Sequence, residues 1–184
     1  MASDVVLQSS SQNINILVVI DTEFVKKTYG PNQLPKEQPQ GISHSNQYMI
    51  CTGAREIISG QGSGDLHFRA NVGDMVSFAG VSIYENADDA VIVYAIKHFS
   101  GDDVFNRFQY NHIERTGAAQ PNEDTADGLP ASHRLQTFAT YDSKVKKSGT
   151  EGFGVCFALY TLDSNGQKQN LYGYYWWDPT ITVA

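Results

Sequence analysis

Cysteine is scarce in this chain, which has only Cys51 and Cys156 among its 184 residues. Small secreted domains that depend on disulfides carry many more cysteines, so this class of protein is excluded. Each cysteine lies within an apolar run, at 48–51 and at 155–157. Because a free cysteine behaves as a small hydrophobic residue, we expect two buried free thiols, with a single disulfide as the alternative.

Positive charge and long apolar runs are also scarce. Lys and Arg number 13 against 20 Asp and Glu, which gives a net charge of −7. The only basic cluster is Lys144, Lys146 and Lys147, and phosphate backbones need more extensive basic surfaces, so we expect no nucleic-acid partner. No stretch approaches the roughly 20 apolar residues of a membrane span, and the N-terminus lacks the basic and apolar segments of a signal peptide. We therefore expect no membrane partner and a cytoplasmic location.

Helix-forming patterns are rare, whereas strand-forming patterns recur along the chain. Asp21 or Thr22 can cap one short helix near residues 22–29, which Gly30-Pro31 would end. Strand signals recur at a spacing typical of β-sandwiches. Two of the expected strands, 90–99 and 152–162, are apolar on both faces and predict central positions. The expected strands are 14–20, 48–52, 65–72, 75–84, 90–99, 134–145, 152–162, 172–177 and a short final strand after Asp178-Pro179.

These signals predict an all-β protein. We expect a two-sheet antiparallel β-sandwich, jelly-roll-like in type, with about eight or nine strands and at most one short helix. Residues 13–184 would form a single domain, and the polar residues 1–12 a disordered N-terminal arm. Residues 30–47 and 114–132 are rich in turn-forming residues and predict long loops.

Motifs for catalysis and metal binding are absent from the sequence. No two of the five histidines have the spacing of a local metal site, and His67 and His98 are expected as exposed or edge-strand residues. The only Gly-x-Ser, within 60–64, lies in a flexible turn rather than a strand-to-helix elbow. Residues 70–78 resemble a strand of copper-binding β-sandwiches, but no histidine follows Cys156, which excludes that site. We expect a protein that is not an enzyme, with no catalytic residues and no metal.

Acidic turns leave calcium as the alternative to a protein without cofactors. Asp88-Asp89, Asp102-Asp103 and the acidic residues within 123–127 lie in turns, from which calcium takes oxygen ligands. Acidic turn residues are also ordinary in a chain of this net charge. The prediction is therefore no cofactor, with calcium at these turns kept open.

Aromatic residues are concentrated near the C-terminus, where Trp176 and Trp177 follow three tyrosines. On an alternating strand Tyr172, Tyr174 and Trp176 share one face, and Tyr175 and Trp177 share the other. One set should belong to the core, whereas the other either forms a platform for stacking on sugars or is buried against a second sheet or subunit.

Five parts of the chain, read in order, share the motifs of one known family. They are Ile16-Leu-Val-Val-Ile-Asp-Thr22; Gly41-Ile with Tyr48-Met-Ile50; Gly64-Asp-Leu-x-Phe with Val72-Gly-Asp-x-Val-x-Phe78; Gly149-Thr-Glu-Gly-Phe with Phe157-Ala-Leu-Tyr160; and Leu171-Tyr-Gly-Tyr with Trp177-Asp-Pro-Thr-Ile181.

From residue 14 on, the sequence resembles the AidA/PixA family of bacterial inclusion-body proteins. The resemblance implies a small cytoplasmic protein made in quantity, which in some members forms intracellular inclusions and is linked to interaction with a host. It implies no catalytic mechanism, so it assigns no active-site residues. One departure is compositional, because the inclusion-body member lacks methionine, whereas this chain has Met49 and Met75 internally.

Two functions from different classes follow from the sequence. The first is a non-enzymatic AidA/PixA-like protein that self-associates as a homo-oligomer, expected as a dimer, with a role in accumulation or host interaction. The alternative is a carbohydrate-binding, lectin-like module. For this alternative we expect Trp176 or Trp177 to stack on a sugar, with Asp102 and Asp103 forming a polar or calcium-supported rim.

Overall fold

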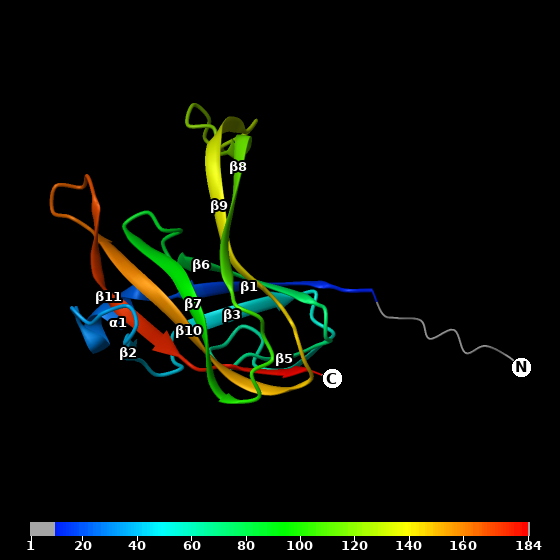
Figure 1. Ribbon diagram of the computed structural model, residues 1–184. Coiled ribbons are helices and arrows are strands. Elements are labelled where there is room, and N and C mark those ends of the chain that lie inside the picture. The colour runs from blue at the N-terminus through cyan, green and yellow to red at the C-terminus, as the bar shows by residue number, and fades with distance from the viewer. Residues whose placement is uncertain (1–9, 184) are drawn as a thin grey trace, which may run out of the picture.

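The computed structural model describes residues 10–183 (Figure 1). Most of the predicted N-terminal arm, residues 1–9, lies outside the described residues. Its last residue is fixed to the body, because the Gln12 backbone N–H donates to Asp74 Oδ1 at 2.8 Å and its carbonyl accepts from the Met75 N–H at 2.9 Å.

The described chain contains twelve strands and one helix. The short helix was predicted correctly: the Asp21 side chain accepts from the Phe24 N–H at 3.0 Å, and Gly30 follows the last turn with a φ of 68°. The elements are β1 (Asn13–Ile20), α1 (Thr22–Tyr29), β2 (Gln40–Gly41), β3 (Gln47–Thr52), β4 (Glu56–Ser59), β5 (His67–Ala70), β6 (Met75–Ser82), β7 (Asp89–Gly101), β8 (Gln109–Gln120), β9 (Ser132–Lys144), β10 (Gly149–Leu162), β11 (Gln169–Trp177) and β12 (Thr180–Val183).

Three strands were not predicted, namely β2, β4 and β8. β2 has two residues and β4 has four, which is too short for a repeating pattern. The second half of β8, 114–120, was expected as part of the loop at 114–132, because that stretch is rich in Gly, Pro, Asn, Asp and Ala and has few large apolar residues. Pairing with β9 overrides this local preference, with a bulge between Arg115 and Ala118.

The strands form two mixed sheets, so the prediction of purely antiparallel pairing is wrong. The first sheet has the order β3-β1-β6-β9-β8, and β1 and β6 are parallel. The second has the order β2-β11-β10-β12-β5-β4, with β7 paired to the other side of β10. Here β11 and β2 are parallel, as are β12 and β5. Parallel neighbours need long crossovers, and the segments between β1 and β6 and between β5 and β12 provide them.

One hydrophobic core lies between the two sheets. β1 alternates buried and exposed residues along its length, and its inward side chains include Ile14, Ile16 and Val18. The rings of Phe78 from the first sheet and Phe153 from the second meet with their centroids 5.7 Å apart. The two-sheet, β-rich part of the prediction is therefore confirmed.

Two edges of this architecture are formed by β7 and by β8. β7 was expected as a central strand, but within the described residues it pairs only with β10 and forms an edge. β8 and β9 end the first sheet and extend beyond its other strands as a two-stranded hairpin (Figure 1). β9 pairs with β6 only over 141–144, so residues 109–140, here called the β8–β9 ribbon, are paired only within the hairpin.

Candidate functional site

The two adjacent tryptophans lie on opposite faces of β11, as the alternation predicts. Trp177 is 1% exposed and its indole N–H donates to the Gly64 carbonyl at 3.0 Å. Tyr175 lies on the same buried face and stacks on Phe157 with the ring centroids 5.6 Å apart. This set therefore belongs to the core, and Trp177 has no free ring face for a sugar.

Trp176 lies on the outer face of the second sheet, in a groove of about 270 Å³. Its ring lies 5.3 Å from that of Phe99, centroid to centroid, which places an aromatic pair on β11 and β7. Gly154 on the intervening strand leaves room for the indole, since a Cβ there would lie 3.0 Å from it. Residues 37–39 line the same groove.

The segment that precedes β2 is held over this face by hydrogen bonds. The Tyr94 hydroxyl donates to the Lys36 carbonyl at 2.7 Å, and Lys97 Nζ donates to the Glu37 carbonyl at 3.1 Å. These bonds fix one wall of the Trp176 groove. The predicted loop at 30–47 therefore has an ordered path across the outer face of the sheet.

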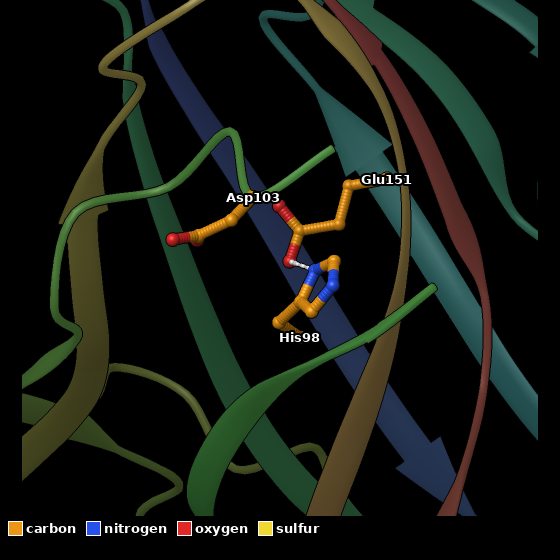
Figure 2. A group of neighbouring side chains, drawn as sticks. All are labelled: His98, Asp103 and Glu151. Carbon is orange, nitrogen blue, oxygen red and sulfur yellow. Dashed lines mark hydrogen bonds and ion pairs between the residues drawn. The ribbon is translucent and has the colours of Figure 1, made fainter. Parts of the chain in front are cut away.

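A second cavity, of about 250 Å³, shares Lys97 and His98 with the Trp176 groove and contains a cluster of ionisable groups. The cluster consists of His98 from β7, Asp103 from the turn that follows β7, and Glu151 from β10 (Figure 2). Each residue offers one ligand atom, and these three atoms lie within 4.8 Å of one another.

The turn after β7 positions Asp103 beside Glu151. Gly101 has a φ of 75°, and a Cβ there would lie 2.2 Å from the Thr150 carbonyl oxygen, so only glycine fits without displacement. The Asp102 N–H then donates to that carbonyl at 2.8 Å. The Val104 N–H donates to Glu151 Oε2 at 2.6 Å and closes the turn onto the carboxylate.

Glu151 is the most buried member of the cluster, with a side chain that is 2% exposed. Its second oxygen, Oε1, faces His98 Nδ1 at 3.3 Å (Figure 2). Burial raises the pKa of Glu151 above its ordinary value; hydrogen bonds from Val104 and His98 oppose the shift, whereas the charge of Asp103 adds to it. The pKa of Asp103 is lowered, chiefly by its hydrogen bond from Lys146 Nζ at 2.6 Å.

The structure separates the residues predicted for a sugar site. Trp176 and Asp103 line neighbouring cavities, whereas Trp177 is in the core. Asp102 braces the turn by accepting from the Thr150 N–H at 3.2 Å, and it lies 3.8 Å from Lys147 Nζ. Glu151 was not predicted as a site residue, because Glu151 and His98 are 53 positions apart in the sequence and only the pairing of β7 with β10 brings them together.

The two cysteines are buried and free, as the sequence predicts. They lie on β3 and β10, which belong to different sheets. Burial raises the pKa of both the Cys51 and the Cys156 thiol to about 11. The thiolate is the reactive form, so neither group is activated as a nucleophile at neutral pH.

Comparisons with known proteins agree with the resemblance seen in the sequence. A family model described as "PixA: Inclusion body protein" matches residues 12–183. A crystal structure of an inclusion body protein of the PixA family from Burkholderia cenocepacia J2315 is similar, at 30% sequence identity and a TM-score of 0.77. That similarity covers 97% of this chain and 99% of the other.

No curated protein matches the chain. Within residues 10–183, no helix has both the length and the apolar character needed to cross a membrane. Because the family model covers nearly the whole sequence, the chain belongs to the PixA family of inclusion body proteins.

Proposed function

We propose that this protein is a non-enzymatic, cytoplasmic PixA-family protein that self-associates through the β8–β9 ribbon, and that the resulting dimer is the unit that accumulates in inclusions. The observation that carries this proposal is the ribbon itself. A two-stranded hairpin alone in water is marginally stable at best, so a ribbon of this length benefits from a partner. The inclusion body description of the family supports accumulation as the role.

The ribbon exposes large apolar side chains on both faces. Ile113 lies opposite Phe138 on one face, and Tyr110 and Leu135 lie on the other. Their exposed fractions are 45% for Ile113, 48% for Phe138, 60% for Tyr110 and 64% for Leu135. Exposed apolar groups of this size on an edge favour association.

The partner of the ribbon is a second copy of this chain, and β8 of one copy pairs with β8 of the other. β8 is the edge strand of its sheet, and its outer backbone groups can extend the sheet into another molecule. An antiparallel pair centred on Ile113 places this residue against its own counterpart. In the same register, His112 of each copy lies opposite Glu114 of the other, which gives two identical pairs. The contact is therefore self-complementary, as a two-fold dimer requires.

The proposal is tested by sedimentation equilibrium of the purified chain and of Ile113→Lys. The wild type should sediment as a dimer. In Ile113→Lys the dimer dissociation constant should be at least tenfold higher, because two lysines would meet at the two-fold axis. Ile83→Lys is the matched control, since Ile83 is 57% exposed but lies outside the ribbon, just after β6. A monomeric wild type at high concentration, or equal weakening by both variants, contradicts the proposal.

Carbohydrate binding is a second candidate because Trp176 and Phe99 form an aromatic pair at a groove. Aromatic faces beside polar groups are suited to stacking on sugar rings. A glycan array probed with and without calcium should then give a set of related glycans, and Trp176→Ala should lose them. A blank array, or unchanged binding by Trp176→Ala, would refute this candidate.

A further inference from the structure

The His98–Asp103–Glu151 cluster differs from an ordinary salt bridge in how its buried charge is balanced. Glu151 is almost fully buried, yet its two oxygens face an imidazole nitrogen and a backbone N–H. Neither group carries a fixed positive charge. Asp103 adds a second carboxylate, whose ligand oxygen lies within 4.8 Å of those of His98 and Glu151. Buried carboxylates in proteins are normally paired or bound to a metal ion.

We propose that His98, Asp103 and Glu151 bind a divalent transition-metal ion of the zinc type. The donors are one imidazole nitrogen and two carboxylate oxygens, a set that zinc accepts in sites with three protein ligands. Water would fill the fourth position from the cavity of about 250 Å³ that all three residues line. Calcium and magnesium bind oxygen ligands, so the imidazole argues against calcium at this end of the turn.

The geometry of the cluster fits such an ion with small movements. Two ligand atoms bound tetrahedrally to zinc at roughly 2.0–2.1 Å lie about 3.3–3.4 Å apart. His98 Nδ1 and Glu151 Oε1 are already 3.3 Å apart. Asp103 is also paired with Lys146, and because the Asp103 side chain is 57% exposed, exchanging this partner for the ion would cost little.

The surroundings of Glu151 also resemble the support that metal ligands receive. The Val104 N–H holds Oε2 at 2.6 Å, which fixes the carboxylate and leaves Oε1 directed at His98. The bound ion would connect the end of β7, the turn at 102–104 and the start of β10. Two cationic residues, Lys97 and Arg107, also line the cavity.

The test is a zinc titration of the full chain against a chromophoric chelator. We expect one zinc ion per chain, with binding weakened at least tenfold in His98→Ala and in Glu151→Gln. His133→Ala is the matched control, because His133 is exposed on β9 and outside the cluster. Millimolar calcium should not displace the zinc.

Fold and oligomeric state are controlled separately. Circular dichroism reports whether each variant is folded, and His98→Ala alters a side chain that is 41% exposed, so it should fold even if Glu151→Gln does not. In Ile113→Lys the stoichiometry should remain one zinc per chain. Absence of saturable zinc binding to the wild type, or equal affinities in folded His98→Ala and His133→Ala, overturns the proposal.

Discussion

Asp74 is the residue whose replacement should destabilise the fold most clearly. Its side chain is fully buried and accepts from Arg55 Nη2 at 2.7 Å and Arg55 Nε at 3.0 Å. It also accepts from the backbone N–H groups of Gln12 and Asn71, each at 2.8 Å. One carboxylate therefore ties together the start of β1, the segment before β4 and the turn before β6.

The expected cost of Asp74→Ala is about 4 kcal/mol. Two hydrogen bonds from backbone N–H groups contribute about 1 kcal/mol each, and the paired guanidinium about 2 kcal/mol. This total lies within the range of roughly 3–5 kcal/mol for breaking a buried ion pair. Asp74→Asn keeps one acceptor oxygen, so it should cost about half as much. Glu56→Gln is the control, because its 3.0 Å ion pair with Arg69 is exposed and should be worth less than about 1 kcal/mol.

The assay is urea unfolding at one protein concentration, so that association contributes equally to every variant. Burial alone would raise the pKa of Asp74, but hydrogen bonds from Arg55, Asn71 and Gln12 more than offset it and lower the pKa. The stabilisation is therefore present above the ordinary carboxyl pKa and is lost as the pH falls through the lowered value. A loss of stability in Asp74→Ala no larger than that in Glu56→Gln would show that Asp74 does not anchor the three segments.

Other predictions concern a histidine and the two thiols. Burial lowers the pKa of His44, but hydrogen bonds to Asp65 and Asp178 outweigh this and raise it. The free energy of unfolding should therefore fall as the pH rises from about 6.5 through the raised pKa of His44. His44→Asn should remove this pH dependence, as measured by urea unfolding. An unchanged pH profile in His44→Asn would contradict the prediction. Cys51 and Cys156 should both react with a thiol reagent in urea but not in native buffer, and fast native reaction at either would contradict their burial.

Local patterns in the sequence predict most strands but not their partners. The alternation in β1 and β11 identifies their buried faces correctly, because one face of each strand lies against the core. The parallel pairing of β1 with β6 depends on how the intervening 54 residues cross over, from 21 to 74, and no local pattern encodes that path. The position of β7 was misjudged for a related reason, since an apolar outer face also occurs on an edge strand beside the Trp176 groove.

For the candidate sites too, local patterns predict the face of a strand on which a residue lies but not its neighbours from other strands. The alternation of side chains along a strand places Trp176 on one face and Trp177 on the other. Only the fold shows that Trp177 is the buried one. The cluster of His98, Asp103 and Glu151 depends on strand pairing across 53 positions and on the turn at Gly101. The Gly-Asp segment that resembles copper proteins has a structural role here, because Asp74 anchors Arg55.

Self-association through β8 can be tested by replacing Ile113 with cysteine. In an antiparallel β8–β8 pair centred there, the two Cβ atoms would lie about 4.5–5.5 Å apart, close enough to form a disulfide after small adjustment. We predict that Ile113→Cys forms a covalent dimer under mild oxidation, whereas Ile83→Cys, which is more exposed but lies outside the ribbon, does not. A failure of Ile113→Cys to crosslink, or equal crosslinking of both variants, would contradict it.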